Sequence, residues 1–133
     1  MTDSVVADPH AAVWLRTATH KLSARAAAAL KLADASGIIY VSAISLVELR
    51  YLVEKGRVAP DALQAIQDAL DDPMTALRLA PIDRAVADAV GTIVRADVPD
   101  MPDRIIAATA HNLGLPLVTR DGKIRASGVL TIW

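Results

Sequence analysis

Three acidic residues bracket one short unit of the sequence between positions 98 and 121. Asp100 and Asp103 stand at the start of an apolar segment with helical spacing, and Asp121 directly follows a short apolar run at residues 116–119. No single basic neighbour in the sequence neutralises all three carboxylates. Carboxylates gathered in this way are typical of a site that binds a divalent cation.

Two further acids lie where the fold is expected to bring them to the same place. Asp8 directly follows the apolar run at residues 4–7, which predicts a buried strand that ends at a carboxylate. Glu48 is four residues from both Ile44 and Leu52, so its side chain lies within or beside the apolar stripe of a helix. Because a buried, unpaired carboxylate is costly, Glu48 needs a metal ion or a distant arginine as its partner.

The combination of these acids predicts a particular chemistry. The chain has no cysteine, and an all-oxygen ligand set selects a hard cation, Mg²⁺ or Mn²⁺, over zinc. Such an ion lowers the pKa of a bound water and stabilises charge on a phosphate under attack. The hypothesis is phosphodiester hydrolysis, with Asp8, Glu48, Asp103 and Asp121 as catalytic metal ligands and Asp100 as a supporting metal ligand.

Each acid also has a purely structural explanation, which the sequence leaves open. Asp8 precedes a proline and Asp121 precedes a glycine, as turn residues often do. Asp100 and Asp103 fit the capping pattern of a helix start. Arg104 and Arg120 flank the acids, and contact with a phosphate or a salt bridge to the acids would explain either arginine equally well.

The elements that must position these residues alternate along the chain. Short apolar runs predict strands at residues 4–7, 38–41, 77–80, 116–119 and 129–133. Helical spacing predicts helices at residues 10–16, 21–35, 42–55, 60–72 and 83–95, with another that starts near Asp103. This alternation is typical of an α/β fold around a mainly parallel sheet, and we expect a single domain over residues 1–133. The strand at 77–80 is expected to be half-exposed at a sheet edge.

This architecture explains why distant acids would meet. Ligands of open parallel sheets bind outside the carboxyl ends of the strands, where the strand order reverses. Asp8 and Asp121 each follow a predicted strand, and Asp103 begins a helix that leads away from the same edge. We therefore expect these side chains to share one site.

Composition limits the other possibilities. The net charge of −1 gives no support to a broadly basic nucleic-acid binder, so contact with a polyanion would need a local basic rim or a metal ion. The absence of cysteine fits a reducing cytoplasm. No apolar run reaches the roughly 18–20 residues that span a bilayer, so we expect a cytoplasmic protein with no membrane partner.

Four segments in order make the chain resemble the PIN-domain ribonucleases, specifically the VapC-type toxins of bacterial toxin–antitoxin pairs. The segments are residues 5–10 with Trp14 and Leu15, residues 42–49, residues 100–110 and residues 117–121. The resemblance covers nearly the whole chain.

This resemblance implies a three-layer α/β/α PIN-like fold and an endoribonuclease that depends on Mg²⁺ or Mn²⁺. By position, the family's acids match Asp8, Glu48, Asp103 and Asp121, with Asp100 similar to an extra acid of many members. Thr119 is similar to a hydroxyl that is often near the metal. A homodimer, an RNA substrate and inhibition by a small cognate antitoxin (VapB-like) are also implied.

Two positions depart from the family pattern. Pro9 stands where Thr or Ser is common, and Ile124 stands near the end where Phe is common. Pro9 keeps open an alternative function, a non-catalytic PIN-like module that binds RNA or a protein, whereas the intact acids argue against it. A phosphatase with an aspartyl nucleophile ranks last. Such an enzyme needs a second acid two residues after the nucleophile, and here that position is occupied by His10.

Overall fold

The computed structural model describes residues 3–133, and its helices and strands alternate as the sequence predicts. Within that part of the chain the elements are β1 (Val5–Ala7), α1 (Pro9–Thr17), the short 3₁₀ helix η1 (Thr19–Lys21), α2 (Ala24–Ser36), β2 (Ile39–Ser42), α3 (Ala43–Glu54), α4 (Pro60–Asp71), β3 (Leu77–Ala80), α5 (Arg84–Val90), α6 (Met101–Leu113), β4 (Leu117–Val118), α7 (Gly122–Ala126) and β5 (Thr131–Ile132). In residues 3–133, no helix combines the length and apolar character needed to cross a bilayer.

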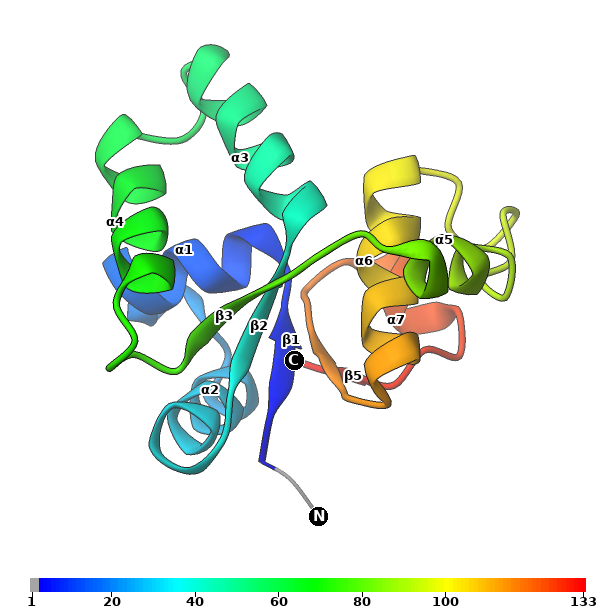
Figure 1. Cartoon of the computed structure of the whole chain (residues 1–133), viewed down its shortest axis with the longest axis horizontal. Coiled ribbons are helices and arrows are strands. Elements are labelled where there is room, and N and C mark those ends of the chain that lie inside the picture. Colours follow the sequence, from blue (N-terminus) through cyan, green and yellow to red (C-terminus); the bar gives the residue numbers. More distant parts are fainter. Residues whose placement is uncertain (1–2) are drawn as a thin grey trace.

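One parallel sheet organises these elements (Figure 1). Its strand order is β3-β2-β1-β4-β5, and every neighbouring pair is parallel. The chain builds outward from β1 through β2 to β3, and then returns to the other side of β1 with β4 and β5. The strand order therefore reverses between β1 and β4. As predicted, β3 is a half-exposed edge strand, in which Leu79 is 47% exposed.

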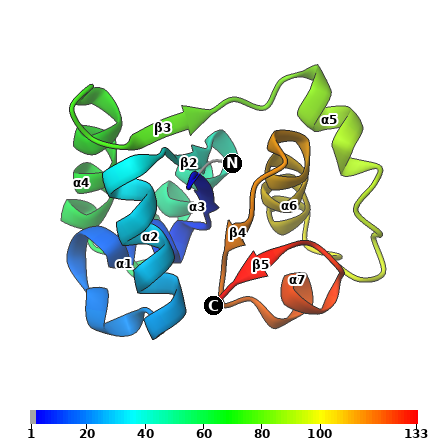
Figure 2. The same ribbon diagram turned by 90° about the horizontal axis from the view of Figure 1, so that it is seen from below.

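The alternation of side chains along the strands explains the three layers. Val5 and Ala7 point to one face of the sheet and pack with α1, α2 and α4, whereas Val6 points to the other face and packs with α5, α6 and α7. Both faces are apolar, as expected of strands in a parallel sheet that helices cover on both sides. Figure 2 shows the two helical layers on either side of the strands. The predicted three-layer α/β/α architecture is confirmed.

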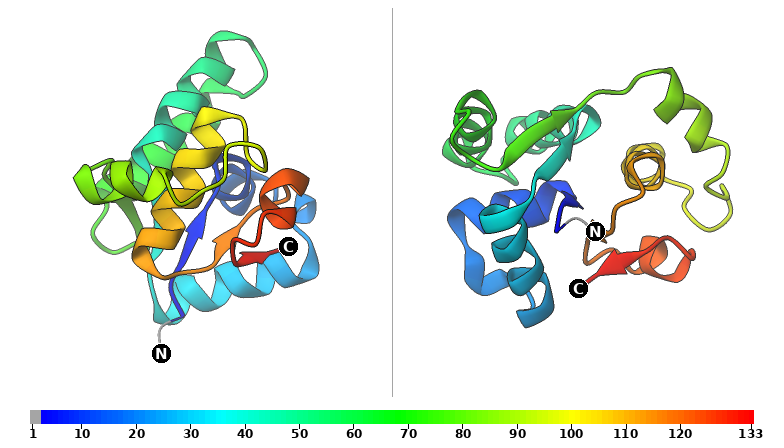
Figure 3. Two further views of the ribbon diagram at one scale, coloured as in Figure 1. Left: turned by 90° about the vertical axis from the view of Figure 1, so that its right-hand side faces the viewer. Right: turned by 60° about the horizontal axis from the view of Figure 1, so that its bottom comes forward.

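Helix α3 rises from the sheet at the carboxyl end of β2, and it lies beside α6 (Figure 3). The hydroxyl of Ser42 caps the helix by accepting a hydrogen bond from the backbone N–H of Ile44 at 3.3 Å. The chain leaves the helix at Gly56, whose φ of 72° favours glycine. The predicted start and end of this helix are both confirmed, and they place Glu48 above the edge of the sheet.

Two predicted helices are wrong in extent. The helix expected at 21–35 begins later than predicted, because Lys21 ends η1 and α2 starts at Ala24. The hydroxyl of Ser23 caps α2 by accepting a hydrogen bond from the N–H of Ala26. The helix expected at 83–95 ends at Val90, and Val94, expected to point inward, is 59% exposed. In addition, α7 follows Asp121 where the sequence had predicted no helix.

Candidate metal and phosphodiester site

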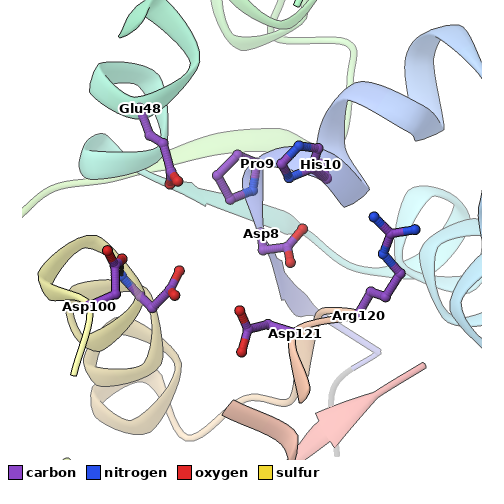
Figure 4. A pocket seen from close by; sticks show the side chains of 8 residues that line it. Asp8, Pro9, His10, Glu48, Asp100, Arg120 and Asp121 are labelled. Carbon is purple, nitrogen blue, oxygen red and sulfur yellow. Dashed lines mark hydrogen bonds between the residues drawn. The ribbon is translucent and has the colours of Figure 1, made fainter. Parts of the chain in front are cut away.

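A pocket of about 320 Å³ opens at the carboxyl edge of the sheet, beside the reversal between β1 and β4. Its lining residues are Asp8, Pro9, His10, Glu48, Asp100, Asp103, Arg120 and Asp121. All five acids that the sequence singled out therefore line one pocket. Figure 4 shows them arriving from different elements, with Glu48 and Asp100 on one side, Asp8 and Asp121 in the middle, and His10 and Arg120 on the other side.

Asp8 is held in place by two hydrogen bonds. One carboxylate oxygen, Oδ1, accepts from the backbone N–H of Ala11 at 2.8 Å and so caps α1. The other, Oδ2, accepts from the hydroxyl of Thr119, just past β4, at 2.5 Å. Burial raises the pKa of Asp8, and these two hydrogen bonds partly oppose the rise. Asp8 therefore both caps α1 and lines the pocket.

Asp100 and Asp121 cap helices in the same way. The Oδ2 atom of Asp100 accepts from the backbone N–H of Asp103 at 3.1 Å, at the start of α6. The Oδ1 atom of Asp121 accepts from the backbone N–H groups of Lys123 and Ile124 at 2.9 and 3.0 Å, at the start of α7. Three helices therefore begin at this pocket, and each is capped by one of its acids.

Glu48 and Asp103 carry the uncompensated charge of the pocket. The Oε2 atom of Glu48 is buried and has no hydrogen-bond partner. Burial raises the pKa of Glu48, and the charges of Asp100, Asp8 and Asp121 raise it further. Burial, followed by the charges of Asp100, Asp121 and Glu48, raises the pKa of Asp103 to about 7. A cation bound beside these two carboxylates would offset the repulsion from the neighbouring acids.

The donor set of this pocket fits a hard divalent cation. Every candidate ligand is a carboxylate oxygen, and the unpartnered Oε2 of Glu48 is the kind of atom that a metal ion would satisfy. As placed, no three His, Cys, Asp or Glu side chains within residues 3–133 form a ready metal cluster. Asp8, Asp100 and Asp121 instead direct carboxylate oxygens to the helix N–H groups described above.

Within residues 3–133, no lysine or arginine forms an ion pair with these five acids. Among the described residues, the one ion pair with an N–O distance within 4.0 Å joins Arg84 and Asp88, both exposed on α5. Arg120 lines the pocket without such a pair. Among the described residues Arg104 makes no salt bridge to these acids, and its guanidinium donates to the backbone carbonyls of Val90 and Ile93, both at 3.0 Å. Arg104 is thus turned toward the end of α5.

The two departures from the family pattern have simple positions in the fold. Pro9 is the first residue of α1, where a helix makes no use of the N–H that proline lacks. Compared with the Thr or Ser that is common in the family, Pro9 brings no hydroxyl to the pocket that it lines. Ile124 is 1% exposed and packs in the core beneath α7, so its role is in packing.

The profile of the PIN domain matches residues 5–129 of this chain. The chain belongs to the PIN domain family. The chain is similar in sequence to Ribonuclease VapC22 of Mycobacterium tuberculosis. The two are 31% identical over 135 residues, which cover 98% of each chain. The resemblance inferred from the four sequence segments is confirmed.

Several solved structures share the fold of this chain. VapBC2 of Rickettsia felis, bound to a DNA fragment from its promoter, gives a TM-score of 0.70 at 19% identity and covers 98% of this chain and 99% of its own. FitAcB of Neisseria gonorrhoeae gives a TM-score of 0.60 at 26% identity, with coverage of 96% and 95%. The first of these similarities supports the fold alone.

Proposed function

We propose that this PIN-domain chain is a metal-dependent endoribonuclease and the toxin of a VapBC-type toxin–antitoxin pair. The observation that carries the proposal is the pocket at the β1–β4 reversal, where five carboxylates meet without an ion pair to any described basic side chain. The relative named Ribonuclease VapC22 supports RNA as the substrate class.

In this proposal Asp8, Glu48, Asp103 and Asp121 would hold Mg²⁺ or Mn²⁺, with Asp100 in support. The bound ion would supply an activated water and stabilise charge on the phosphate. The chain itself orients the ligands, since Asp8 is fixed by the Thr119 hydroxyl and the N-terminus of α1.

The proposed partner is a small cognate antitoxin. The solved structures that share the fold include a toxin–antitoxin complex from Klebsiella pneumoniae, at a TM-score of 0.65 and 20% identity. We further propose that the chain is a single domain, that it acts in the cytoplasm, and that it forms the homodimer that the family implies.

The test compares two aspartates that differ in position. Asp103→Asn removes a charge in the pocket, whereas Asp97→Asn makes the same change on an exposed residue of the loop before α6, outside the pocket. With a mixture of cellular RNA and Mn²⁺, we expect cleavage by wild type and Asp97→Asn and at least a hundredfold loss in Asp103→Asn. Full activity in Asp103→Asn, or wild-type activity unaffected by EDTA, would overturn the proposal.

The alternative is a non-catalytic PIN-like module that binds RNA or a protein, and the missing hydroxyl at Pro9 is what favours it. Calorimetric titration with Mn²⁺ distinguishes the two functions. A catalytic site binds the ion and loses it in Asp8→Ala, whereas a module that has lost its metal site shows no heat of binding in either protein.

A further inference from the structure

A second groove, of about 440 Å³, adjoins the acidic pocket and shares two residues with it, His10 and Arg120. Beyond these, Lys21 after α1 and Arg57 between α3 and α4 line the groove, and no Asp or Glu does so. Figure 4 shows His10 and Arg120 on the side of the acidic pocket away from Glu48 and Asp100. The sign of the charge therefore changes from one compartment to the next.

Trp14 positions the cations of this groove. The guanidinium carbon of Arg120 lies 4.7 Å from the centroid of the Trp14 ring, and the Nζ of Lys21 lies 5.8 Å from it. The ring is only 8% exposed and is backed by the ring of Trp133, with centroids 6.1 Å apart. Cation–π attraction to a fixed indole thus holds Arg120 and Lys21 at the groove.

The three cations are available to a ligand. Lys21, Arg57 and Arg120 are all exposed, and within the described residues none of them has an acid within 4.0 Å. Five carboxylates line the adjoining pocket, yet Arg120 is drawn to the indole face and does not pair with them. An unpaired cationic groove in a chain of net charge −1 is a local feature that fits an extended anion.

We propose that this groove holds backbone phosphates of the RNA strand on one side of the bond that is cut, with Arg120 at the junction and Lys21 and Arg57 farther out. The inference rests on the proposed ribonuclease function and adds the path of the substrate. Because the indole of Trp14 is covered, it offers no stacking face to a base, and the exposed cations in front of it contact phosphates.

The test measures RNA binding in full-length protein that carries Asp103→Asn to prevent cleavage. Lys21→Gln/Arg57→Gln is added to this background and compared with Lys31→Gln/Arg84→Gln, which makes the same charge change at exposed residues outside both compartments. Fluorescence anisotropy with a labelled, mixed-sequence single-stranded RNA is recorded from low to moderate salt. Thermal melting verifies that both proteins are folded.

The groove variant is expected to bind RNA about tenfold more weakly at low salt. The slope of log affinity against log salt should fall by about 1.4, since each phosphate contact with a single strand contributes about 0.7. The Lys31→Gln/Arg84→Gln protein should stay within about twofold of the parent. Equal affinity and slope in the two variants would overturn the groove proposal.

A second measurement separates this inference from the proposed function. With Asp103 intact, Lys21→Gln/Arg57→Gln should bind Mn²⁺ as wild type does, because neither residue lines the acidic pocket. Loss of Mn²⁺ binding in this folded variant would contradict a separate phosphate groove. Absence of Mn²⁺ binding in wild type would instead count against the metal site, whatever the groove does.

Discussion

The hydroxyl of Thr119 donates a hydrogen bond of 2.5 Å to Oδ2 of Asp8, across 111 positions of sequence. The same hydroxyl accepts from the backbone N–H of Asp121 at 3.1 Å. Thr119 is fully buried, so its single side chain links the acid after β1 to the acid after β4. The geometry of the pocket depends on this link.

Thr119→Val keeps the shape of the side chain and removes the link. We expect the free energy of unfolding to fall by about 1–2 kcal/mol, because Asp8 and the N–H of Asp121 each lose a partner. RNA cleavage should fall by at least tenfold. Urea denaturation and an RNA cleavage assay check the two effects, and Thr119→Ser should recover most of both. A Ser variant as poor as Val would show that packing, and not the hydroxyl, matters here.

Asp103→Asn should stabilise the metal-free protein at high pH. The pKa of Asp103 is raised from 3.8 to about 7, so the folded chain holds a proton that the unfolded chain releases between these values. Stability therefore falls as pH rises from about 4 to 7, and it carries the full penalty above 7. The gain in the Asn variant should be about 1–2 kcal/mol at pH 8, after solvent screening of this partly exposed group, and near zero at pH 4.

Denaturation in EDTA at both pH values checks the effect, with Asp97→Asn as the control for removal of an exposed charge. An equal gain at pH 4 and pH 8 would mean that the Asn side chain stabilises the fold by something other than charge removal.

Mn²⁺ should raise the melting temperature of wild type, and more at pH 8 than at pH 6. Ion binding requires ionised carboxylates, and burial and neighbouring charge raise the pKa of both Glu48 and Asp103. At about a hundredfold excess over the dissociation constant, stabilisation should approach 2.7 kcal/mol. Glu48→Gln should lose most of this effect, as seen by differential scanning fluorimetry. A pH-independent shift would argue against these two acids as ligands.

Arg104→Met should destabilise the fold without weakening phosphate contacts. Its guanidinium holds the carbonyls of Val90 and Ile93, so its removal should cost about 2–3 kcal/mol. The salt dependence of RNA binding should remain that of the parent, whereas Arg120→Met should reduce it. Chemical denaturation and anisotropy check the pair. A reduced salt slope in folded Arg104→Met would show instead that Arg104 contacts the RNA phosphates.

The sequence alone predicted the positions of the acids because local patterns sufficed. Asp8 and Asp121 each follow an apolar run, and the rule for parallel sheets brings such ends together at a strand-order reversal. Glu48 was found from its place in an apolar helical stripe. The pocket that these residues line agrees with that reasoning, and their metal-binding roles stay a prediction.

What the sequence could not predict depends on contacts between distant elements. The path of the chain after α5 is one example, since the carbonyls of Val90 and Ile93 accept hydrogen bonds from Arg104, which lies on a later helix. The groove beside the acids is another, since it gathers Lys21, Arg57 and Arg120 from three separated segments around Trp14. The spacing of residues within one segment cannot predict that side chains of separate segments line the same groove.

The pairing of β1 with β4 also affects the order of events during protein synthesis. Asp8 leaves the ribosome before its hydroxyl partner Thr119 and before Asp121, which both emerge more than a hundred residues later. A nascent chain therefore contains α1 through α6 before any complete pocket exists. If the proposed activity is correct, the nascent chain cannot cleave RNA until the segment that carries Thr119 and Asp121 has been synthesised and has paired with β1.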